Sequence, residues 1–201
     1  MQKSCFSGLK LDNGEPIYTQ EYIQSLRDKD KKHPDRLKII AQRGGQERML
    51  AIDADIKIVG GSRGGSKSFS SLMEVLKDIK NPDFHATILR NEKDDLQSLV
   101  TDSYKLFSQF GTYNKSQNDM TWNFTNGGWL KFSYYAGSYQ DFKTRFQGRQ
   151  FAYVCIDEGT QCPYKKFKYL LTNNRNASQL RNRLWITCNT DPETWVRKFI
   201  D

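Results

Sequence analysis

"DIKIVGGSRGGSKSFSSLMEVLKDIK", residues 55–80, is the stretch of this sequence that decides the fold. It opens with "IKIV", a short apolar and β-branched run that is typical of a strand. After the glycines, apolar residues recur at helical spacing, at Phe69, Leu72, Met73, Leu76 and Ile79. The glycine-rich centre therefore lies between a predicted strand and a predicted helix.

The composition is that of a globular chain with a basic excess. Among 201 residues, 37% are hydrophobic, and 31 Lys and Arg against 23 Asp and Glu give a formal net charge of +8. Such a charge suits a polyanionic partner such as nucleic acid. No window approaches the ~20 apolar residues of a membrane span, and the N-terminus lacks the apolar core of a secretory signal. We expect a soluble, intracellular protein without a membrane partner.

The cysteines and histidines exclude several classes of site. Four cysteines are scattered without a CxxC pair, and the chain has two histidines. This pattern argues against a zinc site, against a disulfide scaffold and against a histidine-based catalytic triad.

The rest of the chain alternates between predicted strands and helices. Apolar residues between 96 and 110 mark an amphipathic helix. "MTWNFTNGGWLKFSYY" predicts a hairpin about an Asn-Gly-Gly turn, and its alternating Trp122, Phe124, Leu130 and Phe132 predict one buried face. Further strands are predicted at residues 56–59, 85–90, 151–157 and 183–187. This order predicts an α/β fold with a mainly parallel central sheet flanked by helices, plus an antiparallel hairpin.

The glycine-rich centre fits a phosphate-binding loop. The pattern GxxxxGK[ST] supplies backbone N–H groups that wrap phosphates, a lysine that reaches the β and γ oxygens, and a hydroxyl for Mg²⁺. Ser66 stands where the second glycine is expected, although the two glycines before it can supply positive φ angles. The alternative is a Gly/Ser turn without a ligand. The predicted nucleotide-binding residues here are Gly61, Ser62, Arg63, Gly64, Gly65, Ser66, Lys67, Ser68 and Phe69.

An acidic pair supports the phosphate-binding interpretation. "FAYVCIDEGTQ" places Asp157 and Glu158 at the carboxyl end of a hydrophobic strand, where α/β sheets present ligand-contacting residues. Asp157 and Ser68 could hold Mg²⁺, while Glu158 could orient and deprotonate the attacking water. An acidic pair can also be a helix N-cap. Its occurrence together with the glycine-rich loop favours the catalytic interpretation.

The sequence resembles the ATPase domain of the large terminase subunits of tailed bacteriophages, which are DNA-packaging motors. The resemblance rests on ordered pieces: "GGQERML", "GGSRGGSKS", "ILR", "NGGWLKF", "FQGRQFAYVCIDE" and "LWITCNTDP". It implies a P-loop NTPase fold of the ASCE/RecA-like type over residues 46–201, preceded by an N-terminal extension over residues 1–45.

The resemblance also implies roles for individual residues. Gln46 matches the glutamine that reads the adenine, and a side-chain amide can donate and accept at once. Arg63 matches a P-loop arginine that stabilises charge on the γ-phosphate. Arg145 and Arg149 match the region that supplies an arginine finger to a neighbouring subunit, although a structural or DNA-contacting role stays open for both.

"ITCNTDP" resembles the coupling motif of the family. Thr187 and Asn189 would sense the γ-phosphate by hydrogen bonding. The segment is longer here than the compact Thr-Gly-Asn-Pro form, so the position of the second polar residue stays open. Taken alone, these residues are also typical of a turn.

The partners follow from the resemblance as well. It implies ATP and Mg²⁺ as ligands, and double-stranded DNA, a portal protein and a small terminase subunit as partners. It further implies a ring homo-oligomer on the portal, a monomer in isolation, and a location in the host cell cytoplasm. Because the nuclease domain of large terminases would follow Asp201, we expect weak ATP hydrolysis and no cleavage. Candidate phosphate contacts are Lys165, Lys166, Lys168, Arg175, Arg181 and Arg183.

Two other functions remain open at this point. One is a helicase-like P-loop NTPase that acts on nucleic acid, although the sequence has neither a Ser-Ala-Thr motif after the acidic pair nor a second RecA-like lobe. The other is a basic nucleotide- or nucleic-acid-binding module that does not hydrolyse ATP, which the serine at position 66 favours. A nucleotide titration separates this module from both enzymes.

Overall fold

A computed structural model describes residues 41–42, 44–61, 66–114, 116, 119–189 and 193–200. The chain divides into two compact units, residues 1–53 and 54–201. The described part of the first unit contains one helix, α2 (Gly45–Ala51). The domain boundary predicted at residues 45–46 lies within this first unit and stays a prediction.

A seven-stranded sheet forms the centre of the second unit, in the order β1-β7-β6-β2-β5-β4-β3. The first five strands in this order are parallel to one another, and β4 and β3 complete the sheet by antiparallel pairing. The strands are β1 (Ile56–Val59), β2 (His85–Arg90), β3 (Gly111–Asn114), β4 (Thr121–Phe124), β5 (Trp129–Tyr134), β6 (Tyr153–Ile156) and β7 (Arg183–Thr187).

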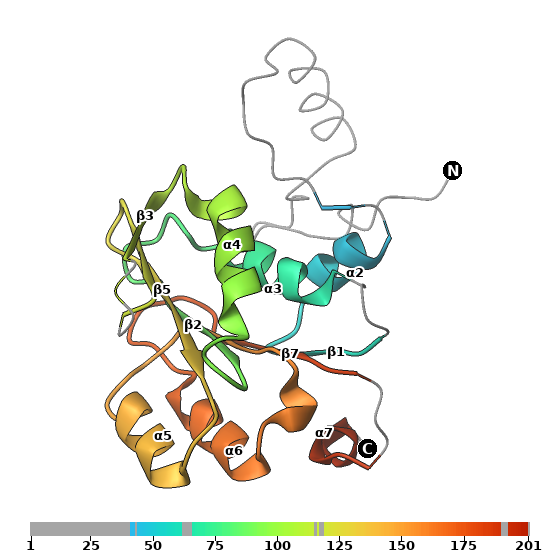
Figure 1. Cartoon of the computed structure of the whole chain (residues 1–201). Coiled ribbons are helices and arrows are strands. Elements are labelled where there is room, and N and C mark those ends of the chain that lie inside the picture. Colours follow the sequence, from blue (N-terminus) through green and yellow to red (C-terminus); the bar gives the residue numbers. More distant parts are fainter. Residues whose placement is uncertain are drawn as a thin grey trace. The chain divides into compact units, whose positions relative to one another are not determined.

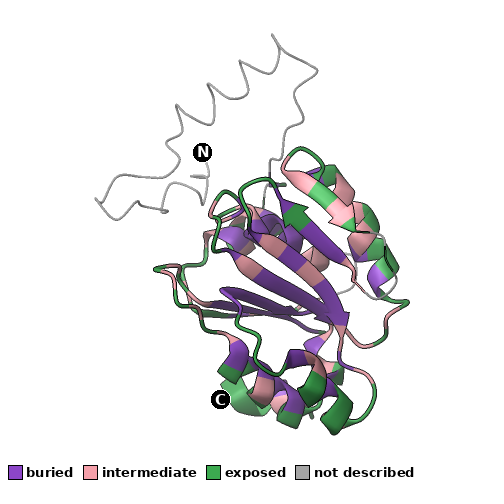
Figure 2. Ribbon diagram, turned by 90° about the vertical axis from the view of Figure 1, so that its left-hand side faces the viewer, coloured by how far each residue is buried: buried purple, intermediate pink, exposed green. Residues whose placement is uncertain are grey.

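Helices cover both faces of this sheet. Figure 1 shows α3 and α4 on one face and α5 and α6 on the other. Figure 2 shows the central strands in the colour of buried residues and exposed positions on the helices. The predicted α/β fold with a mainly parallel sheet and a hairpin is therefore confirmed. The helices are α3 (Lys67–Val75), α4 (Leu96–Phe107), α5 (Tyr139–Phe146), α6 (Tyr164–Asn173) and α7 (Trp195–Ile200), and a 3₁₀ turn, η2, spans Gly159–Gln161.

The central strands form because their sequences are mainly apolar, β-branched or aromatic. Every residue of β6 and β7 is buried, as expected for parallel strands that are covered on both faces. In the hairpin, the four residues predicted to form a buried face are at most 4% exposed. The indole of Trp122 also donates a hydrogen bond to Ser103 Oγ of α4, at 2.8 Å. This contact fixes α4 over the antiparallel end of the sheet.

Aromatic rings fill the opposite face, beneath α5 and α6. The rings of Phe142 and Phe146 lie 4.8 Å apart, and Phe146 lies 6.1 Å from Phe151. All three side chains are at most 2% exposed. Within the described residues, no helix combines the length and apolar character that crossing a membrane requires.

A network of buried charges joins α3 to two strands. The carboxylate of Glu74, on α3, lies 3.2 Å from Lys57 of β1, 2.9 Å from Lys77 and 3.2 Å from Arg183 of β7. Arg183 also pairs with Asp78 at 2.5 Å. Burial lowers the pKa of Lys57 to about 8. Several partners therefore share the one carboxylate, which compensates its removal from water.

Two of the predicted DNA contacts are wrong. Arg183 is 9% exposed and belongs to the buried network around Glu74. Lys166 is 5% exposed, and its ammonium donates to the carbonyl oxygens of Tyr135 and Gly137, both at 2.6 Å. Both cations have buried partners within the fold, and a local sequence pattern does not reveal such tertiary contacts.

Candidate active site

Three neighbouring strands end at one edge of the sheet, and each end carries a polar residue. β6 lies between β7 and β2, and Ile156 pairs with Leu89 of β2 and with Ile186 of β7. Because the strands are parallel, the residues that follow these pairs lie side by side. They are Asp157 after β6, Arg90 at the end of β2 and Thr187 at the end of β7.

Asp157 is the centre of the cluster. Its side chain is fully buried, and its carboxylate accepts hydrogen bonds from three groups. Ser68 Oγ lies 2.8 and 3.0 Å from the two carboxylate oxygens, Thr187 Oγ1 donates at 2.5 Å, and Arg90 Nε donates at 2.7 Å. The structure therefore brings the predicted metal residues Ser68 and Asp157 together and adds Thr187 from the predicted coupling segment.

Glu158 points out of the same strand end and is more accessible. Its side chain is 41% exposed, with Oε1 lying 3.9 Å from an Arg90 nitrogen. Gln161 donates to Oε2 at 3.0 Å, and the Glu158 backbone N–H donates to Thr187 Oγ1 at 2.9 Å. A carboxylate with one face toward solvent can contact a water molecule, which the predicted role as a base requires.

The start of α3 has an unusual backbone. Ser66 precedes the helix with φ 56°, in the left-handed region. The two glycines expected to supply positive φ angles lie outside the described residues, as does all of 62–65, so predictions on Ser62, Arg63, Gly64 and Gly65 stay untested. At position 66 the serine itself adopts the conformation for which the pattern uses glycine. The ammonium of Lys67 donates to the carbonyl of Gly61 at 2.9 Å and so spans the loop.

Backbone strain gathers at this site. Among the described residues, Ser66 and Glu158 are the two non-glycine residues with positive φ. Left-handed backbone costs an L-residue roughly 1–2 kcal/mol. Strained residues concentrate at functional sites, where the surroundings hold them in place. The positions of Ser66 and Glu158 therefore favour the start of α3 and the end of β6 as the candidate functional part of the described chain.

The oxygen atoms of Ser68 and Asp157 fit a magnesium ion. Mg²⁺ prefers hard oxygen ligands and usually takes only one or two protein carboxylates, together with waters and substrate phosphates. A hydroxyl and a carboxylate within hydrogen-bonding distance provide such a set. No group of three or more His, Cys, Asp and Glu side chains that could hold a metal occurs in the part of the chain that the structure describes. Phosphate oxygens and water would therefore complete the coordination.

Three other predicted nucleotide contacts stay untested. Gln46 belongs to the first unit, where it is buried and accepts a hydrogen bond from the backbone N–H of Gln42 at 2.8 Å. Its role at the adenine stays a prediction. Phe69 is partly buried on α3, and Asn189 is exposed after β7.

The two predicted finger arginines differ in their surroundings. Arg145, in the last turn of α5, donates to the carbonyl of Tyr134 at 2.6 Å, and its guanidinium lies 3.8 Å from the centre of that ring. Arg149 is exposed and donates to the carbonyl of Arg145 at 3.0 Å. Arg145 is thus engaged within its own chain, and Arg149 is the more accessible of the two.

The sequence matches a known family over most of its length. A family model described as "Terminase large subunit, T4likevirus-type, N-terminal" matches residues 58–201. The chain belongs to this family. No curated protein matches it.

Solved terminase structures share the fold. The large terminase of a thermophilic bacteriophage matches with a TM-score of 0.58 and 19% identity, over 73% of this chain and 37% of its own. The ATPase domain of the Thermus phage P74-26 large terminase matches with a TM-score of 0.59 and 12% identity, over 90% of this chain and 73% of its own. The HK97 bacteriophage large terminase matches with a TM-score of 0.61 and 14% identity, over 84% of this chain and 38% of its own. This terminase chain thus has the P-loop NTPase fold and spans well under half of two of these relatives.

Two residues of this terminase site were missed by sequence reasoning. Arg90 contacts both acidic residues, and the buried hydroxyl of Tyr135 donates to the backbone carbonyls of Asp157 and Glu158, at 3.3 and 3.0 Å. Burial raises the pKa of Tyr135, which keeps its hydroxyl protonated as a donor. Arg90 could have been found, because it is the last residue of "HATILR" and parallel strands present ligand-contacting residues at this edge.

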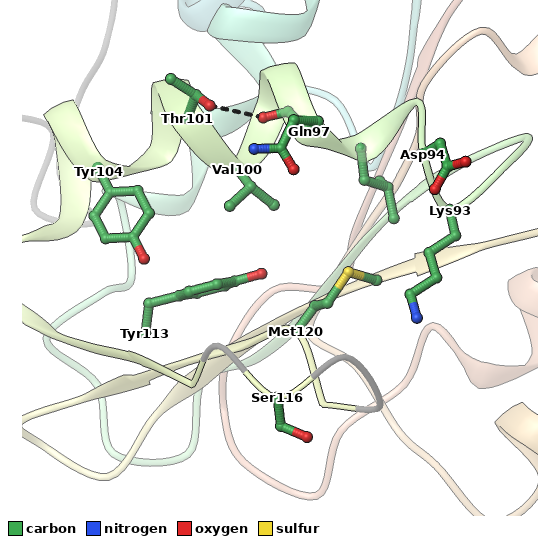
Figure 3. A pocket seen from close by; sticks show the side chains of 10 residues that line it. Lys93, Asp94, Gln97, Val100, Thr101, Tyr104, Tyr113, Ser116 and Met120 are labelled. Atoms are coloured by element: carbon green, nitrogen blue, oxygen red, sulfur yellow. Dashed lines mark hydrogen bonds between the residues drawn. The ribbon is translucent and has the colours of Figure 1, made fainter.

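A separate pocket lies between α4 and the segment around β3. Figure 3 shows Val100 and Tyr104 of α4 facing Tyr113 and Met120 across it. Burial raises the pKa of Tyr113 to about 12. None of the predicted nucleotide contacts belongs to its lining, which consists of Lys93, Asp94, Leu96, Gln97, Val100, Thr101, Tyr104, Tyr113, Ser116 and Met120.

Proposed function

We propose that this terminase chain binds ATP with Mg²⁺ between the loop before α3 and the ends of β6 and β7, and hydrolyses it. The observation that carries the proposal is the contact between Ser68 and the buried Asp157, residues 89 positions apart in the sequence. Structures of the thermophilic phage large terminase in complex with ADP and with ATP-γ-S support a nucleotide ligand.

Each side chain has a task that follows from its position. Lys67 leaves the Gly61 carbonyl for the β and γ oxygens of the nucleotide, and the positive end of α3 faces the phosphates. Ser68 and Asp157 hold the metal. A bound Mg²⁺ would neutralise charge on the phosphate oxygens. Glu158 orients a water molecule and takes its proton, while Thr187 joins the Asp157 carboxylate to the Glu158 backbone.

Arginines stabilise the charge that develops on the γ-phosphate. Arg63 would act from the chain's own loop, and Arg149 from a neighbouring subunit, with Arg145 beside it. A guanidinium presents several donors in a fixed fork that matches phosphate oxygens. Gln46 would read the adenine, and Asn189 would sense the γ-phosphate together with Thr187.

We further propose that hydrolysis drives double-stranded DNA into a procapsid. The chain would act as a ring on the portal protein, with a small terminase subunit as a partner, in the host cell cytoplasm. Exposed cations on and near α6 are suited to phosphate contacts, and the ammonium of Lys165 lies 4.0 Å from the ring centre of Tyr139. The remaining candidates are Lys165, Lys168, Arg175 and Arg181, all exposed.

Replacing the loop lysine tests the nucleotide site. Lys67→Ala removes the cation that would contact the β and γ oxygens, so ATP binding measured by calorimetry should be lost. Lys77→Ala is the control. It removes a partly exposed partner of Glu74 and should bind ATP like the parent. ATP binding by Lys67→Ala at the parental affinity would place the nucleotide elsewhere.

A further inference from the structure

One guanidinium connects both acidic residues of the candidate active site. Arg90 Nε donates to Asp157 Oδ2 at 2.7 Å, and Arg90 Nη2 lies 3.9 Å from Glu158 Oε1. The Arg90 side chain is 17% exposed. Its salt bridge to the fully buried Asp157 is therefore largely shielded from solvent. Charge pairs that are shielded in this way interact more strongly than pairs at a surface.

The third nitrogen of the same guanidinium contacts the start of α4. Arg90 Nη1 donates to the carbonyl of Asp95 at 2.9 Å and lies 3.3 Å from Ser98 Oγ. Arg90 thus has partners in the turn after β6 and at the start of α4. A lysine in its place has one nitrogen and a flexible stem, and so cannot reproduce this fork.

We propose that Arg90 is a positioning residue for the acidic pair, an inference that rests on the proposed ATPase function. By holding Asp157 Oδ2, Arg90 leaves Oδ1 directed at Ser68 and Thr187, where the metal and the γ-phosphate are expected. By attracting Glu158 Oε1, it limits the positions that the catalytic carboxylate can take. The contacts with α4 keep the guanidinium itself in place.

A purely structural role would have different consequences. If Arg90 only tied β2 to α4, its loss would lower the melting temperature and weaken every function of the site together. If it positions the acidic pair, its loss acts on metal-dependent binding and on hydrolysis. Nucleotide binding without metal depends on the loop before α3 and on Lys67, so it should then stay close to that of the parent.

The test compares Arg90→Ala and Arg90→Lys with the parent and with Lys105→Ala. Lys105 pairs with Asp102 at 2.7 Å on the exposed side of α4, so its loss removes an ion pair away from the site. For Arg90→Ala we expect single-turnover hydrolysis to fall about 100-fold, as for a misplaced catalytic group. ATP-γ-S affinity in EDTA should stay within about twofold, and the affinity gained on adding Mg²⁺ should be lost.

Two further results complete the expected pattern. Arg90→Lys should remain well below the parent, because the fork is lost although the charge stays. Guanidinium ion at millimolar concentration should restore part of the activity of Arg90→Ala and leave Lys105→Ala unchanged. Parental hydrolysis by Arg90→Ala would overturn the proposal, as would a parallel loss of melting temperature and metal-free binding.

The design also separates this proposal from the proposed function. If the parent itself fails to hydrolyse ATP, the ATPase function is wrong. The positioning role of Arg90 is then decided by ATP-γ-S titrations, with and without Mg²⁺. Loss of the metal-dependent gain in Arg90→Ala supports the role, and an unchanged gain overturns it.

Discussion

Asp157 and Glu158 are adjacent in the sequence but differ in environment. Asp157 is fully buried and receives hydrogen bonds from Ser68, Thr187 and Arg90, which compensate a carboxylate removed from water. Glu158 is 41% exposed and has room for a water molecule. Glu158 also has a left-handed backbone, with φ 58°. The proposed function therefore assigns the two carboxylates two tasks, one in binding the metal and one in proton transfer.

Conservative amides distinguish these two tasks. Glu158→Gln keeps the size and polarity of the side chain but removes the proton acceptor, so hydrolysis should fall by roughly 10²–10⁴ with little change in nucleotide affinity. Asp157→Asn leaves one oxygen for three donor groups, so it should weaken Mg²⁺-dependent binding more than metal-free binding. Single-turnover hydrolysis and nucleotide titrations on both variants measure this. Parental hydrolysis by Glu158→Gln would make the pair a cap or ion-pair partner.

Ser66 offers a test of strain in the loop. Its side chain makes no capping hydrogen bond, while its φ of 56° is unfavourable for any residue with a Cβ atom. Ser66→Gly should therefore raise the free energy of unfolding by about 0.5–1 kcal/mol, the relief of left-handed strain less the extra flexibility of the unfolded glycine. Ser66→Ala, which keeps the Cβ atom, should show no gain. Urea unfolding of both variants checks this, and Ser66→Gly should not prove less stable than Ser66→Ala.

At the scale of elements, α3 is fixed at both ends. Its first turn contacts the active site through Ser68, and its later turns carry Glu74, which binds cations from β1 and β7. The helix therefore connects the carboxyl ends of the parallel strands to the amino ends of β1 and β7. The buried charges around Glu74, about two turns from Ser68, therefore help to hold the start of α3 in place.

The titration of Lys57 should appear in the pH dependence of stability. Its folded-state pKa of about 8 lies below the ordinary 10.5, because burial disfavours the charged form. Between these values the unfolded chain binds a proton that the folded chain lacks, so this group adds stability as the pH rises from about 8 to 10.5. Below pH 8 its unfavourable effect is fully present. Lys57→Met lacks this titration, so the unfolding free energy of the parent should rise relative to the variant over that range; a constant difference would contradict the assignment.

The sequence predicted the elements whose signal is local. The runs that became β1, β2, β6 and β7 are apolar or β-branched, and an Asn-Gly-Gly turn marks the β4–β5 hairpin. β3 and α5 were missed because their sequences are polar and depend on partners. β3 pairs with β4 so closely that a Cβ at Gly111 would lie 2.2 Å from Asn123 O, and α5 buries Phe142 and Phe146.

The candidate site was predictable in part for the same reason. Asp157 and Lys67 stand next to recognisable strands and glycines, so their neighbourhood in sequence reveals them. Arg90 could be placed among the strand ends because it closes "HATILR", but its contacts with Asp157 and Glu158 depend on β2 lying beside β6, and strand order cannot be read from periodicity. The buried roles of Lys166 and Arg183 likewise depend on tertiary contacts, and composition alone suggested a surface role for both.

At the scale of the whole molecule, the arginines determine whether the proposed site is complete in one chain. Arg145 is held by Tyr134 of its own chain, whereas Arg149 is exposed. A motor subunit that borrows an arginine from its neighbour should hydrolyse slowly when isolated. Arginine fingers are worth about 10³–10⁵ in rate.

Mixing two inactive variants tests the shared site. Lys67→Ala lacks the nucleotide contact but keeps Arg149, and Arg149→Ala keeps the nucleotide contact but lacks the finger. Each should be nearly inactive alone, and the mixture should recover hydrolysis at high protein concentration or on portal rings. The parental turnover number should also rise with concentration. No recovery, with a turnover independent of concentration and of portal, would indicate catalysis in cis with Arg63.

The sheet order also affects synthesis of the chain. Within the described sheet, β1 pairs with β7, which is the last of these strands to be made, so β1 lacks this partner until residues 183–187 have left the ribosome. At about 5–20 residues per second, this wait lasts roughly 6–25 s. During that time an apolar strand and its glycine-rich loop are exposed to chaperones and proteases. Slowing translation between these two strands should therefore lower the yield of folded protein.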